Sequence, residues 1–302
     1  MLLRLWSIRR GAALFARLLI KSLLLMLCAA TFPARAAFDL TLSVATPAAF
    51  TAPQLAELQS SLATAEALWE SVITGYQPGI NLAGITIDVN ANSPFAQANF
   101  PVTVVEAGFT LSTYASIGIN PAVIDDYASW TGIGPPIPNP AYLGLNYLDD
   151  ILAHEIGHVL GIGLLWEDNN LSVGGTGQYL GQHGVRAYRA EFDPTATFIP
   201  VEQAGGAADA HWNQLMRSSA EEGNPSDPFS LSPYTGITDA HGRDFGMELL
   251  TGALDADYGE PFLSNTTIQS LRDLGFTVVP EPNTWVMLIL VLIGLARHRA
   301  VQ

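Results

Sequence analysis

The stretch LDDILAHEIGHVLGIGLLW, residues 148–166, contains two histidines and a glutamate in the order His-Glu-x-x-His. At about 100° per residue, a helix places His154 and His158 one turn apart on a common face, with Glu155 beside them. The opposite side is apolar and consists of Leu152, Ile156, Val159 and Leu160. This pattern predicts a helix over about residues 148–162 that presents polar groups to a cleft and packs its other side into a core.

The polar residues of this helix are those of a catalytic zinc site. Two neutral imidazoles supply two of the three protein ligands of a catalytic zinc ion (Zn2+), and water takes the fourth position. Glu155 is placed to accept the proton of that water and to pass it to a leaving amine. Gly161 and Gly163 end the helix and let later chain return to the metal. Candidates for the third ligand are His183, His211, His241 and several acidic residues.

The N-terminal half predicts a sheet with a crossover helix. Residues 38–45 and 84–91 alternate apolar and polar side chains, as strands do. Between them a helical pattern starts at Thr51 and repeats at steps of three and four. Strand, long helix and strand predict a right-handed crossover onto a parallel pair. Residues 102–109 predict a further strand.

The remaining segments are dominated by loop composition. Residues 110–147, 167–185 and 192–247 are rich in turn-forming residues, and we expect loops there. Residues 266–275 have a helical pattern that stops at Gly275. The fold class expected is therefore α+β, with two long helices in the N-terminal half and one helix in a loop-rich C-terminal half.

Both ends of the chain read as processing segments. Residues 1–36 have a basic region, a short apolar core and small residues at Ala34 and Ala36, as a secretory signal peptide does. Residues 280–302 begin with Pro-Glu-Pro, continue with an apolar stretch that is short for a stable span, and end with arginines. This tail resembles the PEP-CTERM sorting signal of Gram-negative bacteria. The resemblance implies processing by an exosortase and delivery to the cell surface, the outer membrane or the extracellular matrix. Membrane contact is expected only through this tail.

Residues 37–279 remain as one domain of sufficient length for a sizeable core. The chain carries a formal net charge of −15 at pH 7. Such a charge excludes nucleic acid as a partner. The one cysteine, Cys28, lies in the expected signal peptide, so no disulfide is expected in the exported body.

Several stretches resemble leishmanolysin-like metallopeptidases of the metzincin clan. They are TAEALWESVITG, HEIGHVLGIGLLW, YLGQHGVRAYRAEF, FIPVEQAGGAADAHW, MELLTG and TTIQSLRDLGFTV, in the order of the family. The resemblance implies a metzincin-like fold with a twisted, mainly parallel sheet. In that family a large insertion separates the first two zinc ligands from the third, which matches onto His211. The chain departs from the family at Leu250, where the family has the methionine of a turn beneath the metal.

Alternatives to His211 remain open. His241 lies nearer to the MELLTG segment in the sequence. The stretch GALDADYG, residues 252–259, resembles the third-ligand motif of aspzincins, which implies Asp255 as a ligand and Tyr258 as an auxiliary group. The carboxylates of Asp255, Asp257 and Glu260 also suit a weak calcium (Ca2+) site, or form only a solvated acidic turn.

We therefore expect an exported, surface-directed zinc endopeptidase that acts on protein or peptide substrates. His154, His158 and His211 would hold the zinc, and Glu155 would be the general base. The rival hypothesis is a noncatalytic surface or matrix protein that keeps a structural zinc site. Glu155 argues against this rival, because a structural site needs no base beside the metal.

Overall fold

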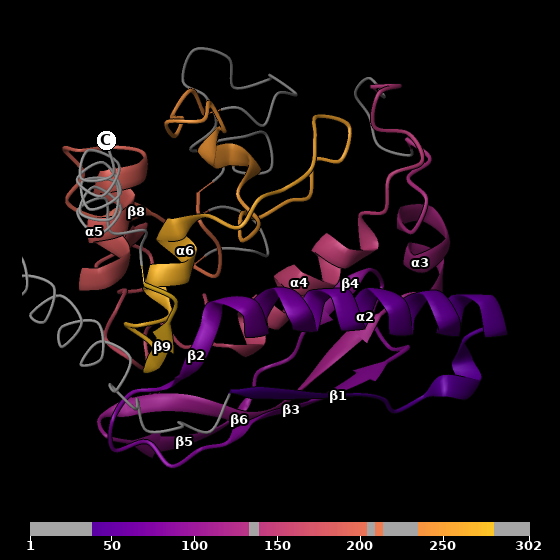
Figure 1. Cartoon of the computed structure of the whole chain (residues 1–302), viewed down its shortest axis with the longest axis horizontal. Coiled ribbons are helices and arrows are strands. Elements are labelled where there is room, and N and C mark those ends of the chain that lie inside the picture. The colour runs from indigo at the N-terminus through magenta and orange to yellow at the C-terminus, as the bar shows by residue number, and fades with distance from the viewer. Residues whose placement is uncertain (1–37, 133–138, 204–208, 214–234, 281–302) are drawn as a thin grey trace, which may run out of the picture. The chain divides into compact units, whose positions relative to one another are not determined.

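The computed structural model describes residues 38–132, 139–203, 209–213 and 235–280. These residues form a five-stranded sheet with helices on one face, followed by short helices and strands in the C-terminal half (Figure 1). None of the helices in these ranges has the length and apolar character needed to cross a membrane. The expected signal peptide and nearly all of the expected sorting tail lie outside the described residues.

The centre of the sheet is parallel. Strand β3 (Gly84–Asn90) pairs in parallel with β1 (Asp39–Val44) on one side and with β6 (Phe109–Ile119) on the other. Strands β4 (Ala96–Ala98) and β5 (Val102–Glu106) both pair antiparallel to β6. The predicted parallel pair on either side of the long helix is therefore confirmed, and the antiparallel strands make the sheet mixed.

Alternation along β3 shows which face of the sheet forms the core. Ile85, Ile87 and Val89 are buried. On the outer face, the carboxylate of Asp88 accepts hydrogen bonds from the hydroxyl groups of Ser43 and Tyr114, which lie on the two neighbouring strands. The outer face therefore carries polar groups that bond to one another, and the apolar inner face is the one that the helices cover.

Helix α2 (Ala52–Val72) begins at the predicted position. Thr51 caps its N-terminus in a reciprocal arrangement with Gln54. Its inward face packs on the sheet with the buried residues Leu58, Ser61, Leu62, Ala65 and Trp69. The Trp69 indole donates a 2.8 Å hydrogen bond to the carbonyl oxygen of Ala153 in the second long helix, so α2 fixes that helix directly.

That second helix, α4 (Leu148–Val159), carries the His-Glu-x-x-His sequence. It lies on the same face of the sheet as α2 (Figure 1). Regular helix ends three residues before the predicted end at 162. Gly161 and Gly163 have φ of 108° and 76°, a region that favours glycine and stops the helix.

The loop predicted over residues 110–147 is wrong in its first part. Strand β6 occupies residues 109–119, and helix α3 (Pro121–Tyr127) follows after an Asn120 cap. Small and polar residues between the apolar ones obscured the strand pattern of β6. Its inward positions nevertheless alternate, with Leu111, Ala115, Ile117 and Ile119 buried.

The C-terminal half is loop-rich, but it contains more regular structure than predicted. Helix α5 (Gln182–Glu191) begins inside the segment 167–185, which was expected to be a loop. Helix α6 (Asn265–Ser270) confirms the predicted last helix in a shorter form, capped by Ser264. The short strands form two antiparallel pairs, β2 (Ile73–Tyr76) with β9 (Phe276–Val278) and β7 (Gln178–Tyr179) with β8 (Ile199–Pro200).

Candidate metal centre

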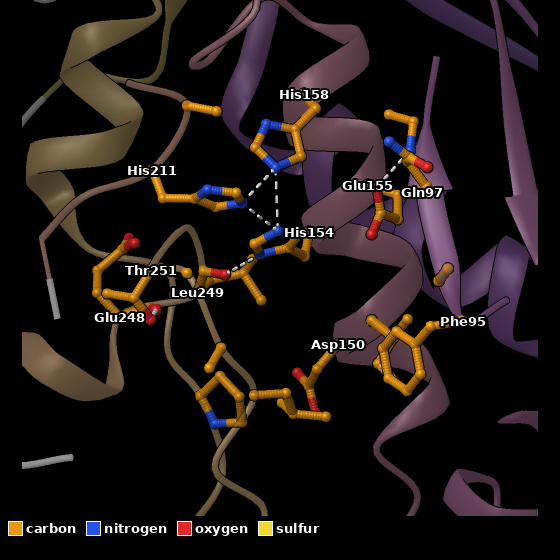
Figure 2. Close-up of a pocket in the computed structure, with 18 of the residues that line it drawn as sticks. Phe95, Gln97, Asp150, His154, Glu155, His158, His211, Glu248, Leu249 and Thr251 are labelled. Carbon is orange, nitrogen blue, oxygen red and sulfur yellow. Dashed lines mark hydrogen bonds between the residues drawn. The ribbon is translucent and has the colours of Figure 1, made fainter. Parts of the chain in front are cut away.

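Three imidazole rings converge at one point of the structure. His154 and His158 come from successive turns of α4, and His211 comes from the segment 209–213 (Figure 2). The Nε2 atom of His158 lies 3.0 Å from that of His154 and 2.9 Å from that of His211. The Nε2 atoms of His154 and His211 lie 3.2 Å apart. Three ring nitrogens therefore form a nearly equilateral triangle.

This triangle has the size of a metal site. Zinc binds imidazole nitrogens at about 2.0–2.1 Å, and a tetrahedral arrangement then separates the nitrogens by about 3.3 Å. The observed separations of 2.9–3.2 Å are slightly shorter than this value. These separations would allow one ion to contact all three nitrogens. The donor set therefore fits zinc.

Backbone carbonyl groups orient two of the rings. The Nδ1 atom of His154 lies 2.7 Å from the carbonyl oxygen of Leu249, and Nδ1 of His158 lies 2.9 Å from that of Ile162. An Nδ1–H donor to a carbonyl leaves the lone pair of Nε2 free for a metal. Burial lowers the pKa of both histidines, which favours the neutral form that binds metals.

His211 is held in place from both sides of the chain. Its carbonyl oxygen accepts a 2.9 Å hydrogen bond from the Glu202 amide. The next residue, Trp212, is fully buried against Trp166, with ring centroids 4.6 Å apart. The Trp212 amide donates to the Leu250 carbonyl oxygen at 3.0 Å. The tryptophan that follows the histidine is thus a packing anchor for the third ring.

Glu155 faces the same cavity from the helix. Its side chain is only 7% exposed, and its Oε2 atom accepts a 2.6 Å hydrogen bond from the backbone amide of Ala98 in the edge strand β4. Burial raises the pKa of Glu155 to about 7, and the Ala98 amide opposes this increase. A carboxyl group with such a pKa can both accept and release a proton near neutral pH.

Leu250, at the position where the family that the sequence resembles has a methionine, packs against the middle of α4. It is fully buried, and its Cδ1 atom would lie 2.8 Å from a Cβ atom built on Gly157, in the middle of α4. Trp69 would lie 3.1 Å from the same Cβ atom. The leucine thus fills the space under the helix.

Glu248 organises the turn that contains Leu249 and Leu250. It is 1% exposed, and its carboxylate accepts hydrogen bonds from the amide of Leu250 and from the side chains of Ser264 and Thr267. The Ser264 amide provides a further donor. Glu248 therefore connects the turn beneath the metal to the start of α6.

The three rings lie in a cavity of about 550 Å³. Strand β4 and its flanking residues form one wall, α4 forms another, and the segment 246–255 forms a third. Asp150, one turn before His154 on α4, also lines the cavity. Burial raises its pKa to about 7, and the neighbouring Asp149 and Glu260 contribute to the increase.

Among the residues that the structure describes, the three histidines are the group of acidic, histidine or cysteine side chains close enough to hold a metal. His183 lies at the start of α5 and His241 in an exposed turn, and neither joins this group. Asp255 lines the cavity but is not part of the group either. Asp257 accepts a hydrogen bond from the Trp130 indole, and no metal group forms there within the described ranges.

Sequence reasoning missed three contributors to the site. The carbonyl of Leu249 and the amide of Ala98 are backbone groups, so the residue types at these positions do not reveal their role. Asp150 carried a readable signal, because it precedes His154 by four residues and so shares its helix face.

No family model, curated protein or solved structure matches the chain.

Proposed function

We propose that this protein is a zinc-dependent endopeptidase of the metzincin type, related to leishmanolysin-like enzymes. The observation that supports the proposal is the convergence of three Nε2 atoms, 2.9–3.2 Å apart, in a cavity that also contains a buried glutamate. His154, His158 and His211 would hold the zinc ion. A structural site would gain nothing from a carboxyl group with a raised pKa beside it.

The chemistry that zinc supplies when bound is Lewis-acid activation of the attacking water and of the scissile carbonyl. Glu155 takes one proton from the water as its oxygen attacks the carbonyl carbon. The same carboxyl group then delivers that proton to the leaving amide nitrogen, so the C–N bond breaks with proton balance. The Ala98 amide fixes the carboxylate for both steps.

The location and partners belong to the same proposal. The signal-like residues 1–36 and the tail 280–302 support export and delivery to the surface of a Gram-negative bacterium. An exosortase-type enzyme would process the tail. The substrates would be proteins or peptides, and the acidic composition disfavours nucleic acid.

The test compares the purified chain with Glu155→Gln, which keeps the shape of the side chain but cannot move the proton. Zinc content is measured in both by mass spectrometry, and cleavage of a denatured protein mixture is followed by peptide mapping. We expect zinc in both and cleavage by the parent alone. Absence of zinc from both proteins would refute the metal centre.

Zinc in both proteins without cleavage by either would favour the rival function, a noncatalytic surface or matrix protein. X-ray absorption then separates the two cases. Three histidine ligands and one exchangeable oxygen support catalysis, whereas four protein ligands support a structural role.

A further inference from the structure

The arginine side chains of the described chain are confined to one region. The whole chain has 28 acidic residues against 13 lysines and arginines, and neither lysine nor arginine occurs between residues 38 and 185. In the described ranges the lysine and arginine positions are Arg186, Arg189, Arg243 and Arg272. They lie in α5, in the loop before residues 245–247 and directly after α6. An anionic partner would therefore be attracted to the region of α5 and α6.

Helix α5 presents two of these arginines to solvent. Arg186 and Arg189 are exposed, and their spacing of three residues places them on one side of the helix. Glu191, the acidic residue of α5, turns instead toward α6, where its carboxylate accepts hydrogen bonds from two backbone amides. Leu180 lies directly before the cap of α5 and is 52% exposed. The solvent side of α5 is thus positively charged and has an exposed apolar side chain at its start.

Arg272 extends this positive side from α5 to the end of α6, which packs against α5. Burial lowers the pKa of His183 in the first turn of α5, and Arg272 and Arg186 act in the same direction while Asp273 opposes them. Both guanidinium groups therefore lie near this ring. The carboxylate of Asp273 accepts hydrogen bonds from the amides that begin α5. Three arginines thus accompany one carboxylate, and we call Arg186, Arg189 and Arg272 the basic face.

Arg243 does not belong to the basic face. Its guanidinium group lies 2.7 Å from the carboxylate of Asp239 and 3.9 Å from that of Glu191. It also lies over the ring of Phe262, 4.2 Å from the centroid. The charge of Arg243 is therefore used within the fold.

The chain leaves the described body soon after Arg272. Strand β9 follows α6, and the described part ends at Pro280 (Figure 1). The apolar stretch of the expected sorting tail begins at Trp285. Five residues of fully extended chain reach at most about 18 Å, so a membrane that holds this stretch lies within about that distance of Pro280. The side of the body near the end of α6 would then face the membrane.

We propose that the basic face docks on an anionic lipid surface, so that the tail and the arginines together orient the protein on the membrane. The ligands are the phosphate groups of the lipids, whose oxygens accept paired hydrogen bonds from guanidinium groups. Leu180 suits the apolar boundary below the headgroups. The inference goes beyond the proposed catalysis and rests only on the location proposed for the tail, residues 280–302.

The acidic composition of the body does not prevent this contact. At physiological ionic strength, charges are screened over about 8 Å. Arginines that touch the headgroups therefore feel the negative surface potential, whereas carboxylates elsewhere on the body are largely screened from it. The same screening means that high salt should weaken the attraction.

The experiment measures the partition of the full chain between buffer and sedimented vesicles. Vesicles of phosphatidylcholine alone are compared with vesicles that also contain phosphatidylglycerol. Partition into the first kind reports on the tail, and the ratio of the second to the first reports on the basic face. We expect the parent to prefer the anionic vesicles at low salt. Arg186→Gln should reduce this ratio by about fivefold, and its combination with Arg189→Gln should reduce it by about 25-fold.

The matched control is Gln59→Glu, at an exposed position of α2. It lowers the net charge by the same one unit as Arg186→Gln but leaves the basic face intact, so the ratio should remain within about twofold of the parent. Equal losses in these two variants would overturn the inference, because overall charge alone would then decide. A parent without preference for phosphatidylglycerol, or a double variant with the parent ratio, would overturn it as well.

Dextran sulfate, a soluble anionic polysaccharide, tests another class of polyanion. If the double variant lost affinity for dextran sulfate but kept the vesicle ratio of the parent, the basic face would serve a polysaccharide and the lipid surface would be refuted. Failure of the tail gives a different result. A parent that ignores phosphatidylcholine but binds the anionic vesicles through Arg186 and Arg189 would refute the membrane contact of the tail and support the basic face.

Discussion

The Nδ1 atom of His154 lies 2.7 Å from the carbonyl oxygen of Leu249, a residue 95 positions later in the chain. This contact joins α4 to the turn that contains Leu249 and Leu250. It sets the tautomer of His154 and the direction of its Nε2 lone pair. The turn itself is held by Glu248, so the orientation of a ligand from the N-terminal half depends on a buried carboxylate of the C-terminal half.

Glu248→Ala should therefore weaken zinc binding without removing any ligand. The variant leaves the amides of Leu250 and Ser264 and two hydroxyl groups without their acceptor. We expect a loss of about 3–5 kcal/mol in unfolding free energy and about 10- to 100-fold in zinc affinity. Chelator competition and urea unfolding measure the two effects. The control Glu167→Ala, at an exposed position, should change neither quantity. A folded Glu248→Ala variant with full zinc affinity would show that Glu248 does not help to orient His154.

The same carboxyl group should make stability depend on pH. Burial raises the pKa of Glu248 to about 7, although four hydrogen bonds oppose the increase. Between about pH 4.5 and 7 the folded state then binds more protons than the unfolded state, so its stability falls as the pH rises. Relative to Glu248→Gln, the metal-free parent should lose up to roughly 3 kcal/mol over this range and change little above it.

Urea unfolding at a series of pH values, with a chelator present, measures this difference. The groups that donate to Glu248 do not titrate in the range, because they are amides and hydroxyl groups. A difference that grows with rising pH would show that the hydrogen bonds outweigh burial and that the carboxylate is charged throughout.

The sequence predicted what local periodicity determines. Helix α4 and the common face of its two histidines follow from the spacing of four residues, and α2 follows from its cap and apolar repeat. Strand β6 was missed because small and polar residues between its inward apolar positions obscured the alternation. Residue types alone left His183, His211, His241 and several acidic residues as candidates for the third ligand. The position of that ligand depends on a close approach of two distant segments at Gly163 and Ala210, which the sequence does not reveal.

Gly157 and Leu250 should be energetically coupled. Gly157→Ala places a methyl group against the side chains of Leu250 and Trp69, and overpacking of this kind costs about 1–3 kcal/mol. Leu250→Ala opens a cavity and costs about 2–5 kcal/mol. The double variant should lose less than the sum of the two, by about 1 kcal/mol or more, in urea unfolding. Strict additivity would contradict the contact. Leu250→Met should cost less than about 1.5 kcal/mol and retain zinc.

Gly163 decides whether His211 reaches the other two histidines. A Cβ atom at this position would lie 2.0 Å from the carbonyl oxygen of Ala210, the residue before His211. Gly163→Ala must therefore displace the ligand segment, and the backbone there cannot yield easily because Trp212 is buried behind it. We expect zinc affinity to fall by at least about 100-fold. The φ of 76° adds a strain of about 1–2 kcal/mol.

Gly242→Ala separates the two effects. Gly242 has a similar φ of 80°, but nothing lies within 4 Å of an added Cβ atom. This variant should lose only the strain energy of about 1–2 kcal/mol in thermal or urea unfolding and keep its zinc. If Gly163→Ala matched Gly242→Ala in zinc affinity, the close approach to Ala210 would not control the third ligand. A selective loss of zinc in Gly163→Ala would identify this close approach as the feature that completes the metal centre.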